Sequence, residues 1–82
     1  MIYHVQIKVM PLKDLLDPQG KAVMSGLESL ELGGVKEVRV GKHITLNIES
    51  ASPDDAKTLA DEACKKLLAN PVMEYYEIEL VN

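Results

Sequence analysis

Two segments, one near each end of the chain, alternate apolar and polar residues. From Tyr3 to Val9 the odd positions are apolar and the even positions are polar. In the C-terminal stretch MEYYEIELVN, residues 73–82, Tyr76, Ile78 and Leu80 share one parity and the residues between them are glutamates. Successive side chains of a strand point to opposite faces of a sheet, so each segment predicts a strand with one buried face.

The stretch KEVRVGKHITLNIE, residues 36–49, alternates as well but has Gly41 at its centre. Its aliphatic residues all share one parity: Val38, Val40, Ile44, Leu46 and Ile48. A two-residue turn at Gly41-Lys42 would place the two halves of this set on opposite faces. A hairpin therefore needs an odd loop, such as residues 41–43, which sets Val40 opposite Ile44. One long strand bent at a bulge on Gly41 keeps the same facing and is the alternative.

Between these strands, the segment that starts at Asp17-Pro18 changes to a helical period. Asp17 is a suitable N-cap, and proline is favoured at the first helical position because its missing N–H has no partner there. Val23, Leu27 and Leu30 then fall on one face. The pattern predicts a helix that ends at the glycines of residues 33–34, which can adopt left-handed geometry.

A second helix is predicted after Ser52-Pro53, where Ser52 and Asp55 form an S-x-x-D start signal. Its apolar stripe comprises Ala56, Leu59, Ala60, Ala63 and Leu67. Asp61 precedes Lys65 by four residues, a spacing that favours an ion pair on the exposed side. Asn70-Pro71 marks the end of this helix.

The order of these elements is β-α-β-β-α-β within one domain, residues 1–82. It predicts an α+β, ferredoxin-like fold with an antiparallel sheet and two helices on one face. A chain of 82 residues has a small core, and this one lacks phenylalanine and tryptophan. We therefore expect a homo-oligomer, a dimer or tetramer, that associates through the sheet. An exposed Tyr75 among glutamates is a candidate anchor for that contact.

Composition and charge exclude several classes of function. The net charge is −4, without the clustered basic residues that a nucleic-acid interface requires. No apolar run approaches the length of a membrane span, and the N-terminus alternates where a signal peptide would be continuously apolar. One cysteine, Cys64, cannot form an intrachain disulfide. The expected location is the cytoplasm.

Residues suited to catalysis or metal binding are scattered. His4 and His43 have no Cys or His cluster at ligand spacing beside them, and Cys64 fits a small buried apolar residue, so we expect no catalytic site, metal or cofactor. Arg39, Gly41 and Lys42 form either a solvated tip or an anion contact. Residues 17–20 form either a helix start alone or a partner contact, and glycine at position 20 favours the contact, since a helix former would serve better if only the cap mattered.

Three stretches taken together, LLDPQGKAV, VKEVRVGKHITLNIE and CKKLLANPVMEYYEIEL, resemble the PurS family. PurS is the small subunit of phosphoribosylformylglycinamidine (FGAM) synthase in purine biosynthesis. The resemblance covers nearly the whole chain and lies in three motifs in fixed order: D-P-x-G, V-R-x-G-K and L-L-A-N-P-V. Gly26 departs from it, since a better helix former is expected there.

The resemblance implies a subunit of FGAM synthase that has no active site of its own. In such systems a PurL-type synthetase uses ATP to activate the amide oxygen of formylglycinamide ribonucleotide, and a PurQ-type glutaminase releases ammonia. The PurS homo-oligomer helps to dock the two so that ammonia passes between them. The candidate partner-binding residues are Asp17, Pro18, Gln19, Gly20, Arg39, Gly41, Lys42, Asn70, Pro71, Glu74 and Tyr75. The alternative function is a small-molecule-sensing regulatory module of the same topology.

Overall fold

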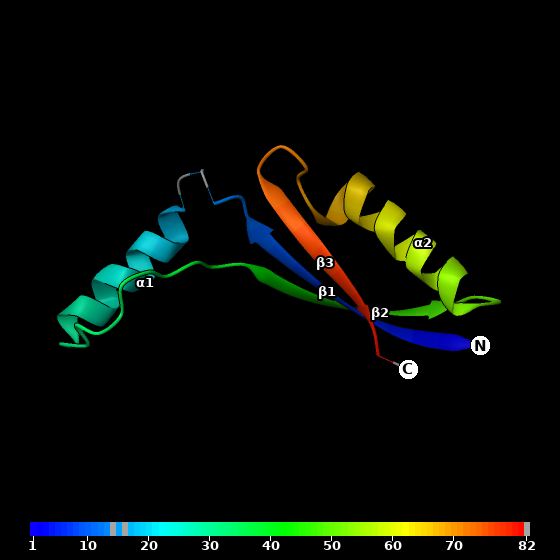
Figure 1. Cartoon of the computed structure of the whole chain (residues 1–82), viewed down its shortest axis with the longest axis horizontal. Helices are drawn as coiled ribbons and strands as arrows, with labels where there is room; N and C mark the ends of the chain where they lie inside the picture. The colour runs from blue at the N-terminus through cyan, green and yellow to red at the C-terminus, as the bar shows by residue number, and fades with distance from the viewer. Residues whose placement is uncertain (14, 16, 82) are drawn as a thin grey trace.

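The computed structural model describes residues 1–13, 15 and 17–81. Its elements are β1 (Ile2–Pro11), α1 (Pro18–Ser29), β2 (Lys42–Glu49), α2 (Pro53–Ala63), a π-helical turn η1 (Cys64–Leu68) and β3 (Glu74–Leu80). The strands form one antiparallel sheet in the order β2-β1-β3 (Figure 1). The α+β class with its antiparallel sheet is thus confirmed. The prediction for the last strand extended to Asn82, which lies outside the described residues.

Strand β1 is the centre of the sheet, and its alternation produces the core. Val5, Ile7 and Val9 are almost completely buried. Ile7 is paired with Ile44 on β2 and with Ile78 on β3, so aliphatic side chains meet across all three strands. The even residues of β1 lie on the opposite face together with Glu77 and Glu79 of β3, as the period-2 pattern predicted.

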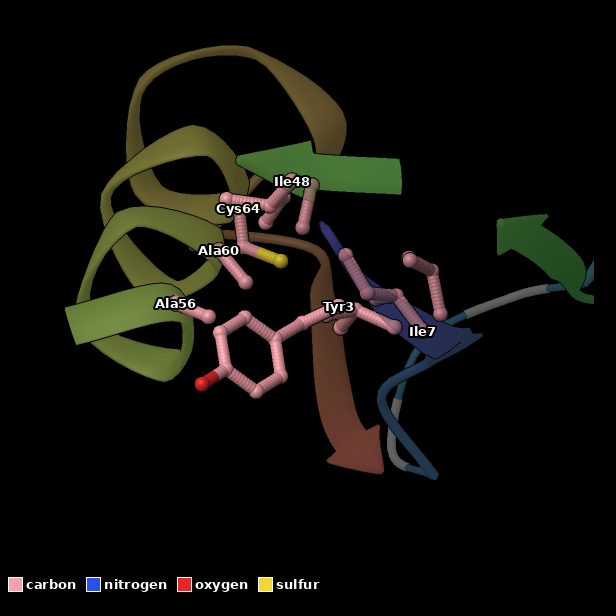
Figure 2. Close-up of a cluster of buried hydrophobic side chains, with 9 residues drawn as sticks. Tyr3, Ile7, Ile48, Ala56, Ala60 and Cys64 are labelled. Atoms are coloured by element: carbon pink, nitrogen blue, oxygen red, sulfur yellow. The ribbon is translucent and has the colours of Figure 1, made fainter. Parts of the chain in front are cut away.

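Helix α2 covers the apolar face of the sheet. Ser52 caps it, because its hydroxyl oxygen accepts a hydrogen bond from the Asp55 N–H at 3.1 Å, which confirms the predicted start signal. Small residues point toward the sheet: Ala56 and Ala60 of α2 and Cys64 at the start of η1 are fully buried in one cluster with Tyr3 (Figure 2). Small residues here let the helix axis lie close to the sheet, so one helix suffices to close this part of the core.

The predicted strand at residues 36–40 is absent, and β2 begins only at Lys42. Residues 35–41 run from α1 into β2 without a turn back (Figure 1). A hairpin at 41–43 does not form, because Lys42 and His43 are already paired with Val9 and Lys8 of β1. The described residues therefore form three strands rather than four, and the backbone passes through Gly41 without reversing direction.

Helix α1 does not lie on the sheet beside α2, contrary to the expectation of two helices on one face. It extends from the end of the sheet as an arm (Figure 1), which we define as residues 18–35. The molecule measures 51 × 26 × 14 Å, with a radius of gyration of 16.2 Å, whereas a compact domain of this length has about 12 Å. Within α1, Gly20 alone is buried, while Val23 is 45% and Leu30 70% exposed.

The two helix ends also differ from the predictions. In α1, Leu30 caps the helix and Glu31, with φ 61°, adopts the left-handed conformation expected of Gly33 or Gly34. The Leu32 N–H reaches the Leu27 carbonyl, which is the Schellman pattern. The turn η1 winds more slowly than an α-helix, so Leu67 leaves the predicted stripe and is 83% exposed.

No helix among the described residues is both long and apolar enough to cross a bilayer.

Candidate functional site

The three segments that carry the candidate partner-binding residues meet where the arm joins the sheet. An open cavity of about 390 Å³ marks this place, which we call the junction. Its lining residues are Pro11, Leu15, Asp17, Pro18, Gln19, Val40, Asn70, Met73 and Glu74. Residues far apart in the sequence, at 17–19, 40 and 70–74, are therefore parts of one surface.

Asp17 connects the arm to the segment before β2. One carboxylate oxygen accepts the Gly20 N–H at 3.0 Å as the N-cap of α1, and the other accepts the Val40 N–H at 3.1 Å. These two backbone donors, followed by the nearby Arg39 guanidinium, lower the pKa of Asp17 below its ordinary value. The residue is thus both a helix cap and a long-range tie.

Arg39 holds the loop between β1 and α1. Its guanidinium donates to the carbonyl oxygens of Pro11 at 2.7 Å, Leu12 at 2.8 Å and Lys13 at 3.3 Å. The same group lies 3.9 Å from the carboxylate of Asp17. A planar guanidinium can serve several acceptors at once, which a lysine ammonium on its flexible stem does less well. Arg39 therefore acts on the chain's own backbone, and its side chain is only 21% exposed.

Gly20 and Gly41 allow close approach of the backbone at the junction. A Cβ on Gly20 would collide with the Val38 carbonyl oxygen and the Asp17 carboxylate. A Cβ on Gly41 would collide with the Val9 carbonyl oxygen and the sulfur of Met10. The D-P-x-G and V-R-x-G-K motifs thus fit each other.

The turn before β3 is internally braced. Glu74 accepts the Asn70 N–H at 2.8 Å, Asn70 accepts the Val72 N–H through its side chain at 3.0 Å, and Lys42 lies 3.7 Å from Glu74. This brace projects Pro71 and Val72 into solvent, with Val72 78% exposed. A rigid turn with an apolar tip is suited to insertion into a partner.

Comparison with known proteins is decisive at this point. The family model described as PurS, phosphoribosylformylglycinamidine (FGAM) synthase, matches residues 4–82. The chain belongs to the PurS family.

Relatives support this over nearly the whole length. The PurS subunit of FGAM synthase from Bacillus subtilis is 43% identical over 96% of this chain and 93% of its own length. That from Synechocystis is 44% identical over 95% of this chain and 78% of its own. Among solved structures, B. subtilis PurS superposes with a TM-score of 0.88 at 42% identity, covering 98% of this chain and 99% of that one. A chain of the Thermotoga maritima PurLQS structure gives 0.91 at 31% identity, covering 99% of each.

With the PurS fold in view, the candidate residues divide into two groups. Asp17, Gly20, Arg39 and Gly41 are engaged within the chain and shape the junction. Glu74 is also engaged within the chain, through the Asn70 N–H and Lys42, and its side chain is 21% exposed. The others are exposed at the surface, namely Pro18, Gln19, Lys42, Asn70, Pro71 and Tyr75. Tyr75 is 40% exposed and belongs to the polar sheet face.

Two apolar residues of this PurS chain were missed by the sequence reasoning. Val72 stands in a turn, where an apolar residue next to Pro71 was a signal that could have been used. Leu67 was assigned to the buried stripe, and nothing in the residues around it indicates the π turn that exposes it.

The residues considered for catalysis in this PurS chain are dispersed. Nδ1 of His4 lies within hydrogen-bonding distance of the Asn47 side chain, and His43 is exposed near the far end of the same face. Cys64 is buried in the core, and this burial raises the pKa of its thiol. Within residues 1–13, 15 and 17–81, no group of three His, Cys, Asp or Glu is arranged to hold a metal ion.

Proposed function

We propose that this chain is the PurS subunit of FGAM synthase in de novo purine biosynthesis and acts as a docking subunit without an active site of its own. It brings a PurQ-type glutaminase to a PurL-type, ATP-dependent synthetase in the cytoplasm. Ammonia released at one site then reaches the other before it is lost to solvent. The observation that carries the proposal is the match to a chain of the PurLQS structure, which extends over 99% of both chains.

The junction supports a docking role. Its shape is set by Asp17 and Arg39, and two braced segments, residues 17–20 and 70–74, present side chains from it. A surface that is already ordered binds a partner at a lower entropic cost than a mobile one. We assign the partner contacts to this surface and to Tyr75 beside it.

The arm supports self-association as part of the same function. Val23, Leu30 and Leu32 are between 45% and 70% exposed in the single chain. Apolar patches of this kind on a small protein mark interaction sites, and a small core gains stability from a second copy. The proposed unit of docking is therefore a homo-oligomer, a dimer or tetramer.

Reconstitution tests this function. PurL- and PurQ-type subunits are assayed with and without the chain, using either glutamine or ammonium as the nitrogen source. We expect omission of the chain to abolish glutamine-dependent synthesis and to leave ammonia-dependent synthesis intact. Equal glutamine-dependent rates in its absence contradict the proposal.

A matched pair of variants locates the contact. Val72→Asp places a charge at the tip of the braced turn, and Val81→Asp makes the same change at the other end of β3, where Val81 is 52% exposed. We expect Val72→Asp to weaken the glutamine-dependent rate at least 10-fold at limiting subunit and Val81→Asp to leave it within twofold. A larger loss of the glutamine-dependent rate for Val81→Asp than for Val72→Asp would show that the contact does not lie at the turn of residues 70–74.

The cavity favours one second candidate, a small-molecule-sensing module. Its volume of about 390 Å³ lies in the range of ligand pockets. A thermal shift of the isolated chain with an amino acid or nucleotide would support this candidate. A subunit that only docks other proteins is expected to show no thermal shift with these small molecules.

A further inference from the structure

The cavity at the junction has apolar walls. Among the described residues, the apolar ones that line it are Pro11, Leu15, Pro18, Val40 and Met73. The two prolines are rigid, and Met73 is 51% exposed and can adapt its unbranched side chain to a guest. Such walls favour a guest with an apolar body that displaces water from them.

The charge that lines the cavity is negative. Its charged lining residues, within the part of the chain that the structure describes, are Asp17 and Glu74. The two side chains are only 13% and 21% exposed, so little water solvates either carboxylate. Their cationic partners, Arg39 and Lys42, are not among the described lining residues. The group favoured inside the cavity is therefore a cation.

Glu74 has an acceptor to spare for such a cation. Its Oε1 accepts the Asn70 N–H at 2.8 Å, whereas its Oε2 lies 3.7 Å from Nζ of Lys42, which is longer than a hydrogen bond. Lys42 is 58% exposed, and an ion pair with an exposed lysine contributes little to stability. An incoming donor can therefore replace Lys42 at a small cost.

The chain's own arginine cannot be this donor. Arg39 is the one arginine in the sequence. Its guanidinium already donates to the carbonyl oxygens of Pro11, Leu12 and Lys13. A second copy holds its Arg39 in the same way, so self-association does not supply a free guanidinium either. An arginine in the cavity therefore comes from a different protein.

We propose that the junction binds an arginine side chain of a partner subunit. The aliphatic stem packs against the apolar walls, and the guanidinium donates to Oε2 of Glu74 in place of Lys42. Arginine suits this place better than lysine, because its planar group is less strongly hydrated and can serve two acceptors at once. Arginine is also enriched among the residues that anchor protein interfaces. This inference rests on the docking role in the proposed function and adds the chemistry of one contact.

Two substitutions with opposite expected effects test the contact. Glu74→Gln keeps an oxygen for the Asn70 N–H but removes the charge, and Lys42→Met removes the cation that competes for Glu74. Each variant is titrated into PurL- and PurQ-type subunits, and the concentration that gives the half-maximal glutamine-dependent rate is measured. We expect this concentration to rise at least about 10-fold for Glu74→Gln and to stay equal or fall for Lys42→Met.

A purely structural role of the Glu74–Lys42 pair predicts a different result. If the pair only braces the turn before β3, both substitutions raise the half-maximal concentration, and the proposal is wrong. Glu62→Gln, on exposed α2, makes the same chemical change away from the junction and is expected to stay within about twofold of the wild type.

A double-mutant cycle identifies the guest on the partner's side. Each arginine of the two partner subunits is replaced by lysine and assayed with the wild-type chain and with Glu74→Gln. We expect one arginine whose replacement weakens binding of the wild-type chain at least about 5-fold but weakens binding of Glu74→Gln less than twofold, since that variant has already lost the contact. Independent, additive effects for every arginine would overturn the proposal.

The outcomes keep the contact and the docking role apart. If Glu74→Gln acts at the same concentration as the wild type, the arginine contact is wrong and the docking role stands. If glutamine-dependent synthesis does not need the chain at all, both are wrong. Circular dichroism and sedimentation velocity check that each variant keeps the fold and mass of the wild type. If Glu74→Gln does not fold, Lys42→Met decides, and a half-maximal concentration more than twice that of the wild type overturns the proposal.

Discussion

The carboxylate of Asp17 accepts a hydrogen bond from the backbone N–H of Val40, 23 residues further along the chain. This bond joins the first turn of α1 to the segment that enters β2. Since Arg39, the residue before Val40, holds the carbonyls of the loop ahead of α1, both ends of the arm are fixed at one place. The direction of the arm is therefore set by the chain itself before any partner binds.

Replacement of Arg39 by lysine tests how much the hydrogen bonds of its guanidinium to the loop carbonyls contribute to stability. Lysine keeps the charge but cannot serve the carbonyls of Pro11 and Leu12 together, and we expect a loss of about 1.5–3 kcal/mol in the free energy of unfolding. Denaturant titration at one fixed protein concentration measures it, with Lys57→Arg on exposed α2 as the control. A variant as stable as the wild type would show that these hydrogen bonds of Arg39 do not contribute to the free energy of unfolding.

Two glycines of α1 should respond in opposite directions to alanine. Gly20→Ala forces a methyl group onto the Val38 carbonyl, so we expect destabilisation of at least about 1 kcal/mol. Gly26 has nothing within 4 Å of an added Cβ, and Gly26→Ala should stabilise the helix by about 0.5–1 kcal/mol. Thermal unfolding of both variants at equal concentration provides the comparison. The same sign for both would contradict the packing described at Gly20.

The hydrogen bond from Tyr76 to Asp61 predicts a stability profile with two limits. This hydrogen bond is the largest cause that lowers the pKa of Asp61 below 3.8. The stability that the ionised carboxylate adds to the fold is therefore fully present above pH 3.8 and is lost as the pH falls through the pKa of the folded state. The same bond raises the pKa of Tyr76 from 10.0 to about 12. The fold therefore favours the neutral phenol of Tyr76. The stability that this phenol adds is fully present below pH 10 and is lost as the pH rises toward 12.

Tyr76→Phe removes both effects. We expect its difference in unfolding free energy from the wild type to be greatest at neutral pH and to shrink at both limits. Tyr75→Phe, on the opposite face of the sheet, is the control. A Tyr76→Phe difference that does not change with pH would mean that the pair is not coupled to titration.

Cys64 offers a test of the core. Cys64→Ser keeps the size but buries a hydroxyl among apolar groups, and we expect a loss of about 1–3 kcal/mol. Cys64→Ala removes the sulfur without adding a polar group and should cost less. The native thiol should also react with a maleimide at least 100-fold more slowly than the unfolded chain. Rapid labelling of the native protein would place the thiol at the surface.

The pattern of apolar and polar residues was sufficient to predict β1, α2 and β3, because the apolar faces of these elements pack against one another within one chain. It wrongly predicted a strand at residues 36–40, which alternate like a strand but pair with no strand among the described residues. The position of α1 could not be derived either, since it depends on the Asp17–Val40 tie between distant residues. The candidate residues were grouped by resemblance, and only the structure showed that Asp17 and Arg39 serve the chain's own backbone.

An uncovered arm also ties the lifetime of the chain to its abundance. Leu30, 70% exposed at the tip of α1, is accessible to proteases in a single copy. We therefore expect copies without a counterpart to be cleaved by proteases before assembled copies, which would match the amount of subunit to the number of complexes.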